Sequence, residues 1–311
     1  MGTPNGGAKT PLSQNVSEVR RAIIFLNPKK GKARDLANEM VKELNSLNIK
    51  TDIFSFDGKQ EFIQKDNCDV AISLGGDGTV LSTARAMSPG KVPIFPVNLG
   101  TFGFIAGVHP LEWREAFDQW LSGKAQISQR VMFDVSIERE GSEERMGYCL
   151  NDAVIMDPGK LTNLRVSYCE TGQHETNREK ALKLGLYRSD GLIVSTPTGS
   201  TAYSAAAGGP IVDPELQAVI LNNICPFTLN HRPMVLPLGE IIVELDETQR
   251  KGVLLTLDGQ VTEKIKLTDK IYIKKAQNDC LLIASGRQGF FQALRTKLSW
   301  AGGVKGGSPI A

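Results

Sequence analysis

The glycine-rich turn at residues 74–79, with the sequence LGGDGT, is the part of the chain best suited to chemistry. It joins an apolar run typical of a buried strand to the predicted start of a helix near Thr79. Glycines in such a turn permit positive φ angles and let a phosphate approach the backbone, and the free N–H groups of a helix start favour negative charge. We therefore predict a phosphate loop made of Gly75, Gly76, Gly78 and Thr79.

Asp77 is the acidic residue of this turn. A carboxylate repels a phosphate, but it can bind a divalent cation or take the proton of an attacking hydroxyl. Asp77 is therefore the candidate catalytic residue of a phosphoryl transfer. The structural alternative is a tight strand-to-helix turn in which Asp77 only caps the helix.

The segment from Arg188 to Pro210 holds a second concentration of polar and small residues. A predicted strand at residues 192–195 leads into a hydroxyl-rich loop, and the small residues after it allow a flat ligand to lie close to the backbone. Tyr203 can pack on a base, and the Ser and Thr hydroxyls can bond a ribose or an amide. A Ser/Thr capping loop followed by tight packing is an equally open interpretation.

Three shorter segments add polar groups. Asn151 and Asp152 interrupt an apolar run, where they suit either a ribose with two neighbouring hydroxyls or a satisfied structural bend. Residues 98–104 follow the fourth predicted strand and so belong to the same sheet edge as the glycine turn, although Phe104 equally suits the core. Residues 256–260, with the sequence TLDGQ, are typical of a hairpin turn.

Alternating strands and helices position the glycine turn. Apolar runs occur at residues 22–26, 51–56, 69–74 and 92–97, with helical patterns at residues 36–47 and from about 79. Short apolar strands that alternate with helices predict a doubly wound parallel α/β domain, and ligands of such sheets bind at the carboxyl ends of the strands. We assign residues 21–125 to this domain.

The pattern changes after a predicted helix at residues 111–121. Strand-like runs follow at residues 131–138, 148–156, 164–168, 241–245, 253–257, 270–276 and 281–284. Many short strands separated by turns predict a β-sandwich-like domain, here residues 126–284, whose tip at residues 171–181 is a variable hairpin. A helix at residues 285–300 is expected to pack back on the first domain, and residues 1–20 and 301–311 have the composition of flexible tails.

Composition argues against several classes of protein. The chain has 36 Lys and Arg against 34 Asp and Glu, a formal charge of +2, and no long basic run, so nucleic acid is not an expected partner. Its five cysteines are scattered without a CxxC pair and are expected to be reduced and mostly buried. Neither a membrane-spanning apolar run nor a secretory signal is recognised, so we expect a cytoplasmic protein.

The chain resembles the NAD kinase family in five blocks that agree in identity, order and approximate spacing, namely residues 75–79, 98–104, 151–152, 190–210 and 258–260. The similarity extends from about Ile23 to Phe291. The block at 190–210 is long and highly specific. The GGDGT block is less so, because diacylglycerol, sphingosine and phosphofructokinase-type kinases share it.

The resemblance implies a function and roles for individual residues. An NAD kinase phosphorylates the adenosine ribose 2′-hydroxyl of NAD with ATP or polyphosphate to make NADP, and Asp77 would orient and deprotonate that hydroxyl. The other implied substrate contacts are Gly78, Phe104, Asn151, Asp152, Asn163, Arg188, Asp190, Gln260 and the turn Thr201, Ala202, Tyr203, Ser204, Ala205 and Ala206. Two positions depart from the family pattern. Asn163 stands where some members carry His, which weakens its role, and Asp152 stands where many have Glu.

The resemblance also implies partners. Mg²⁺ would accompany the triphosphate donor, since no dedicated metal cage is visible in the sequence. A homodimer or homotetramer is expected, in which Asp190 belongs to the pocket of a neighbouring copy. Two alternatives remain from the residues themselves. One is a lipid kinase of the diacylglycerol or sphingosine type, whose apolar groove the hydroxyl-rich loop does not suit, and the other is a module that senses NAD without turnover.

Overall fold

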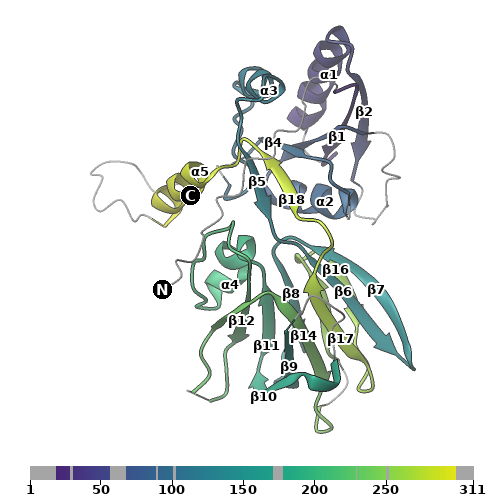
Figure 1. Cartoon of the computed structure of the whole chain (residues 1–311), viewed down its shortest axis with the longest axis vertical. Helices are drawn as coiled ribbons and strands as arrows, with labels where there is room; N and C mark the ends of the chain where they lie inside the picture. The colour runs from purple at the N-terminus through teal and green to yellow at the C-terminus, as the bar shows by residue number, and fades with distance from the viewer. Residues whose placement is uncertain are drawn as a thin grey trace, which may run out of the picture.

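The computed structural model describes residues 19–28, 31–56, 68–88, 90–100, 103–170, 178–228, 230–249 and 252–298. The predicted tails lie almost wholly outside these ranges, as do residues 101–102 of the predicted crevice and most of the predicted hairpin tip at 171–181. The chain forms an α/β domain stacked on a larger β domain (Figure 1). The coarse division into an α/β half and a β-rich half is therefore confirmed.

The first domain is built on a six-stranded sheet in the order β2-β1-β3-β4-β18-β5. Its strands are β1 (Arg21–Leu26), β2 (Lys50–Ser55), β3 (Val70–Gly75), β4 (Ile94–Asn98), β5 (Ile127–Arg130) and β18 (Cys280–Ile283). The first four are parallel, β18 continues parallel to β4, and β5 runs antiparallel to β18. The buried, largely apolar sequences of β1 and β3 reflect cover on both faces of the sheet.

Helices cover this sheet from both sides. The apolar faces of α1 (Gly31–Ser46) and α3 (Trp113–Leu121) share one core with alternate residues of β1, β3 and β4. Helix α2 (Asp77–Met87) packs on the opposite face, in a separate cluster. Because α2 begins immediately after β3, the glycine turn lies at the carboxyl edge of the sheet, as predicted.

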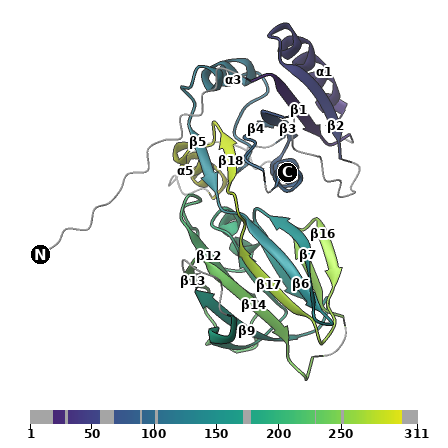
Figure 2. The same ribbon diagram turned by 45° about the vertical axis from the view of Figure 1, so that its right-hand side comes forward.

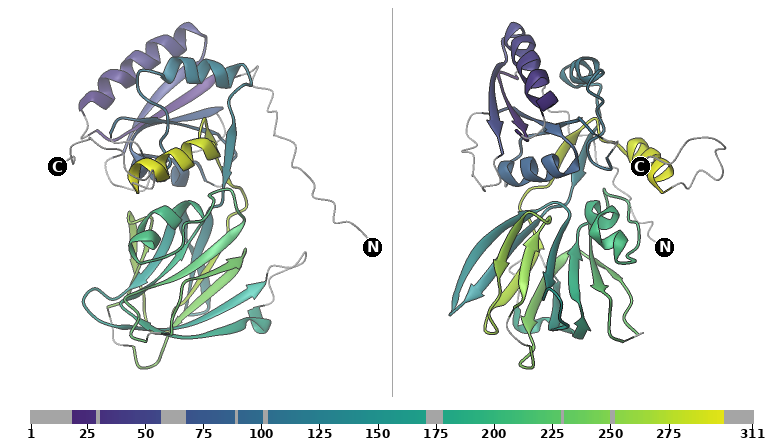
Figure 3. Two further views of the ribbon diagram at one scale, coloured as in Figure 1. Left: turned by 90° about the vertical axis from the view of Figure 1, so that its left-hand side faces the viewer. Right: turned by 180° about the vertical axis from the view of Figure 1, so that it is seen from behind.

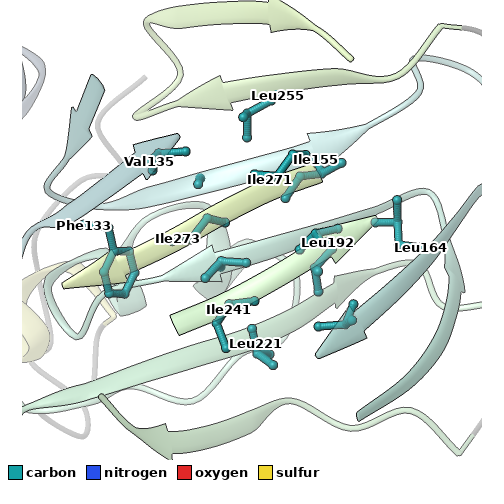
Figure 4. Packing of buried hydrophobic residues seen from close by; sticks show 14 of the residues in the cluster. Phe133, Val135, Ile155, Leu164, Leu192, Leu221, Ile241, Leu255, Ile271 and Ile273 are labelled. Atoms are coloured by element: carbon teal, nitrogen blue, oxygen red, sulfur yellow. The ribbon is translucent and has the colours of Figure 1, made fainter. Parts of the chain in front are cut away.

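The second domain is a sandwich of two six-stranded antiparallel sheets, in the orders β10-β9-β14-β17-β6-β7 and β13-β12-β11-β8-β15-β16. Their strands are β6 (Phe133–Arg139), β7 (Ser142–Cys149), β8 (Asp152–Met156), β9 (Thr162–Glu170), β10 (Leu182–Ser189), β11 (Gly191–Ser195), β12 (Ala218–Ile224), β13 (Met234–Pro237), β14 (Gly239–Leu245), β15 (Leu254–Leu257), β16 (Val261–Lys264) and β17 (Lys270–Lys275). Aliphatic side chains from both sheets, including Val135, Ile155, Leu192 and Ile271, fill the space between them (Figure 4).

The domain boundary differs from the one predicted. Strands β5 and β18, which the sequence assigns to the second domain, complete the sheet of the first, and Figure 2 shows them side by side where they lead into the sandwich. The sequence predicts a strand at residues 281–284 but none at residues 127–130, whose sequence is ISQR, and it shows the partner of neither, since strand pairing depends on chain topology. The sandwich is therefore inserted between β5 and β18.

The last described helix, α5 (Arg287–Lys297), follows β18 and lies beside the short helix α4 (Tyr203–Ala206) in both views of Figure 3. Its Phe290 ring is 6.4 Å from the Phe104 ring of the first domain, and Arg287 pairs with Asp213 of the second at 2.9 Å. Within the described residues, no helix is long and apolar enough to span a bilayer.

Candidate functional site

The glycine turn is shaped by close packing. Strand β3 ends at Gly75, Gly76 precedes α2 with extended backbone, and Asp77 is the first helical residue. Gly75, Gly76 and Gly78 do not adopt the positive φ angles that glycine permits. Instead, a Cβ on Gly75 would lie 2.7 Å from the Cβ of Thr79, closer than two carbon atoms can approach. Glycine is needed here so that the first turn of α2 can fold against the end of the strand.

The Asp77 carboxylate is held by the loop that follows β4. Its Oδ2 accepts a hydrogen bond from the N–H of Phe104 at 2.9 Å, and its Oδ1 accepts from Ile105 at 3.2 Å and Ala106 at 3.0 Å. A Cβ on Gly103 would lie 2.6 Å from Asp77 Cγ. No side-chain hydrogen bond caps the start of α2, and the Asp77 side chain is instead fixed against a second segment of backbone.

Phe104 is half-buried, between the catalytic candidate and the C-terminal helix. Its backbone N–H binds Asp77, and its ring packs against Phe290 with the Lys297 Nζ 4.9 Å from the ring centroid. The loop is also braced by Asn98, whose Nδ2 donates to the carbonyl oxygen of Ala106 at 3.2 Å. The position of Phe104 thus couples α5 to the Asp77 loop.

Asn151 and Asp152 lie where β7 gives way to β8, and both are buried. Their backbone N–H groups donate to Asp258 Oδ1 at 2.7 and 3.3 Å. The carbonyl oxygen of Asn151 accepts from the N–H of Thr196 at 2.9 Å, so the segment is tied to the loop after β11. The side-chain Oδ1 of Asn151 is buried and has no hydrogen-bond partner among the described residues. The backbone is thus satisfied, while one buried side-chain acceptor has no partner among the described residues.

The Asp152 carboxyl has an unusual electrostatic environment. Burial, followed by the charge of Asp258, raises the pKa of Asp152 to about 7. Burial also raises the pKa of Asp258, which Arg85 and three backbone N–H groups oppose. The carboxyl groups of Asp152 and Asp258 therefore lie close together and buried. A polar ligand that donates hydrogen bonds to Asp152 would offset the free-energy cost of burying its carboxyl group.

Gln260 connects the second domain to the start of α2. Its Nε2 donates to the carbonyl oxygen of Gly78 at 2.9 Å, and its Oε1 accepts from the Ser82 hydroxyl at 2.7 Å and from Arg85. The TLDGQ segment does form the predicted hairpin, between β15 and β16, with Asp258 in the left-handed region at φ 51°. The turn thereby brings Asp77 and Gly78 close to Asn151 and Asp152.

The hydroxyl-rich loop after β11 folds into a 3₁₀ turn at Thr198–Thr201, followed by α4. Two of its hydroxyls are structural, since Ser200 Oγ bonds the backbone of Val212 and Ser204 accepts from Asn222 Nδ2. Thr198 differs. Its Oγ1 is buried without a partner in the part of the chain that the structure describes. Thr198 is not among the contacts predicted from the sequence, because nothing in a run of hydroxyl residues shows which of them is left unbonded.

Within the contact turn predicted at residues 201–206, the side chains differ in accessibility. Tyr203 is 40% exposed, whereas Ser204 is fully buried. Thr201, Ala202 and Ala205 are half-buried, and Ala206 is exposed. Tyr203 therefore remains available to stack on a flat ligand, while Ser204 serves to hold α4 against β12.

The remaining predicted contacts lie elsewhere. Arg188 and Asp190 are exposed near the β10–β11 junction, and the Arg188 guanidinium lies over the Phe227 ring at 4.5 Å. Strand β11 separates them from Ser195, which pairs with Asp152, and five residues of strand span about 16 Å. Asn163 pairs with Arg188 across β9 and β10. One chain therefore does not bring these three residues to the site around Asp152.

Whether the site can hold a metal ion depends on the ligand side chains that it offers. Among the described residues, no group of three or more His, Cys, Asp or Glu side chains is arranged to hold a metal ion. Asp77 already accepts three N–H groups, which leaves little of its coordination capacity for a cation. These residues fit a metal that arrives bound to phosphate oxygens better than a resident ion.

A carboxylate fixed at the start of a helix, next to buried polar groups of a second domain, defines an α/β-plus-β protein with a site suited to phosphoryl transfer. Comparisons with known proteins agree with this class. Residues 12–125 match the ATP-NAD kinase N-terminal domain, and residues 175–285 match the ATP-NAD kinase C-terminal domain. The NAD kinase of Treponema denticola is 38% identical over 288 residues, which cover 91% of this chain and 98% of that protein. The chain belongs to the NAD kinase family.

Further relatives extend the comparison. The NAD kinase of Geobacter sulfurreducens is 39% identical over 246 residues, covering 78% of this chain and 84% of the relative. The crystal structure of yeast NADH kinase complexed with NADH superimposes with a TM-score of 0.78 at 21% identity, covering 93% of this chain and 90% of that one. An Archaeoglobus fulgidus NAD kinase in complex with ATP gives a TM-score of 0.66 at 23% identity, covering 90% and 98%. These structures establish the shared fold.

Proposed function

We propose that this chain is an NAD kinase that transfers the terminal phosphoryl group of ATP to the adenosine ribose 2′-hydroxyl of NAD, giving NADP. The observation that carries the proposal is the Asp77 carboxylate, which three backbone N–H groups fix beside the polar ends of the second domain. Phosphoryl transfer requires positioning and charge stabilisation rather than a covalent nucleophile. Family membership identifies the acceptor, and the lipid-kinase and sensor alternatives find no support in the comparisons.

The roles of the residues follow from this reaction. Asp77 orients the 2′-hydroxyl and accepts its proton as the new P–O bond forms, because an alcohol releases its proton only late in the transfer. Asn151 and Asp152 hold the ribose and adenine portions, and the buried Oδ1 of Asn151 supports that role. The turn at residues 201–206 contacts the adenine. The backbone of the GGDGT turn and the start of α2 receive the donor phosphates.

The donor and its metal enter together. We propose ATP as the donor, in keeping with the ATP complex of the Archaeoglobus fulgidus relative, with polyphosphate as a second substrate to be tested. Mg²⁺ would accompany the donor phosphates at the GGDGT turn and would neutralise their charge there. The position of Phe104 and α5 beside the Asp77 loop supports the C-terminal helix as a wall of the same site.

We further propose a homodimer or homotetramer that works in the cytoplasm. Arg188 and Asp190 lie about 16 Å along β11 from the Asp152 end of the site. If they bind the nicotinamide end of NAD, they serve the site of a neighbouring copy. All five cysteines are free thiols, which agrees with a reducing compartment.

The test is to incubate the purified protein with NAD, ATP and Mg²⁺ and to follow NADP with an NADP-specific dehydrogenase, alongside Asp77→Asn. We expect NADP from the wild type and a rate reduced by about a hundredfold or more in Asp77→Asn, since one oriented proton acceptor contributes about 10²–10⁴-fold. An unaltered rate in Asp77→Asn would remove that residue from the mechanism. Absence of NADP from a folded wild type that binds NAD would overturn the proposed function, once polyphosphate has also been tried.

A further inference from the structure

Helix α2 belongs to both domains. Its residues Val80, Leu81 and Ala84 share a buried cluster with Met132, Tyr148 and Leu150, which flank and belong to strands of the sandwich. The Ser88 hydroxyl donates to Met132 Sδ at 3.1 Å. Figures 1 and 3 show α2 directly above the ends of β6 and β7. Helix α2, which begins with Asp77, therefore packs directly against the second domain.

An ion pair is buried in this contact. Arg85, on α2, donates from Nη1 to Asp258 Oδ2 at 2.9 Å, and the two side chains are 6% and 0% exposed. Asp258 also accepts the backbone N–H groups of Leu150 and Asn151 at 3.2 and 2.7 Å. A single carboxylate thus joins α2 to the backbone that presents the ligand-binding polar groups of the second domain.

The Nη2 of Arg85 donates a hydrogen bond to Gln260 Oε1, and the Gln260 amide is also hydrogen-bonded to Gly78 and Ser82. The bonds form a continuous path from the carbonyl oxygen of Gly78, through Gln260, Arg85 and Asp258, to the N–H of Asn151. The donors of a planar guanidinium hold two acceptors in one fixed geometry, whereas the rotatable donors of an ammonium group on a flexible stem do not. The path therefore fixes one domain's end of the site relative to the other.

We propose that Arg85 is a positioning residue of the phosphoryl transfer, which with Asp258 sets the distance between Asp77 and the acceptor-binding segment at Asn151–Asp152. The inference rests on the proposed function. Burying an ion pair stabilises a fold weakly or not at all compared with apolar packing, so its presence here needs another explanation. The explanation that we favour is precise positioning, because a displacement of about 1 Å at reacting atoms can lower the rate about a hundredfold.

The variant that tests this is Arg85→Lys, which keeps a positive charge beside Asp258 but loses the rigid planar donors that hold Asp258 and Gln260 in one geometry. We expect kcat to fall about tenfold, with the KM values for NAD and ATP within twofold of wild type. Arg139→Lys is the matched control, because Arg139 also binds a buried carboxylate, that of Asp269, within the sandwich. It should lose comparable thermal stability and keep its kcat.

A second readout separates positioning from general weakening. In an Asp77→Asn background, Arg85→Lys should cause little further loss of kcat, because the group that it positions is already gone. A merely structural defect would lower both backgrounds by the same factor, and that result would overturn the proposal. So would a folded Arg85→Lys enzyme with wild-type kcat.

If Arg85→Lys does not fold, Ser82→Ala carries the test. It removes the hydroxyl bond to the same Gln260 amide without altering a charge, and kcat should fall about threefold with unchanged KM values. An unchanged kcat overturns the proposal. Failure of the proposed function itself is distinguishable, since the wild type would then form no NADP.

Discussion

Gly103→Ala should disable the site without replacing any residue that is proposed to contact substrate. The added Cβ would lie 2.6 Å from Asp77 Cγ and 2.8 Å from Oδ2. Carbon atoms pack at about 3.5–4.0 Å, so the carboxylate and the loop must separate by about 1 Å. We expect kcat to fall about a hundredfold, equivalent to about 2.7 kcal/mol in the activation barrier. The KM for NAD should change little, because Asn151 and Asp152 lie on the other domain.

The assay is steady-state NADP formation at varied NAD and ATP, with thermal unfolding measured on the same samples. Loss of part of the three N–H bonds to Asp77 should lower stability by about 1–3 kcal/mol, which leaves the protein folded at the assay temperature. Gly107→Ala is the control, since its Cβ would meet only the carbonyl oxygen of Ala284 at 3.9 Å, an ordinary contact. A folded Gly103→Ala enzyme with kcat within about threefold of wild type would refute the argument that this loop fixes the catalytic carboxylate.

Two further predictions concern the second domain. Asp152 ionises near pH 3.8 when unfolded, and burial followed by the Asp258 charge raises its pKa to about 7 when folded, so its contribution to stability is lost as the pH rises between these values. Asp152→Asn should therefore gain about 3 kcal/mol more over wild type at pH 8 than at pH 5 in denaturant unfolding, since each pKa unit is worth about 1.36 kcal/mol, and an equal gain at both would contradict the raised pKa. Thr198→Val removes a buried hydroxyl without a partner in the described residues, so stability should hold while the KM for NAD rises about tenfold. An unchanged KM would show that NAD does not use this hydroxyl.

The local structure around the candidate site residues could be predicted from the sequence. The strand–turn–helix around the GGDGT motif, the polar break at Asn151 and Asp152 and the hairpin at residues 256–260 all form where predicted. Each depends on short-range preferences, namely apolar runs, glycines and turn residues, that act within a few residues. The α/β-then-β division follows from the same patterns.

Contacts between residues far apart in the sequence could not be predicted from it. Nothing near β5 or β18 indicates that they pair with each other rather than with the sandwich. Arg85 reads as an ordinary helix residue in the sequence, because its role depends on Asp258, which lies 173 positions away. The need for glycine at position 75 could not be predicted for the same reason, since its close contact with Thr79 is a matter of packing rather than of turn type.

The insertion of the sandwich between β5 and β18 has a consequence for biosynthesis. The sheet that carries the glycine turn lacks an inner strand until residues 280–283 leave the ribosome, when nearly the whole chain has been made. The sandwich is synthesised before then and can fold by itself, because its strands are contiguous within residues 133–275. The nascent chain should therefore gain its C-terminal half first, and a ribosome stalled before β18 should hold a folded sandwich beside a protease-sensitive N-terminal half.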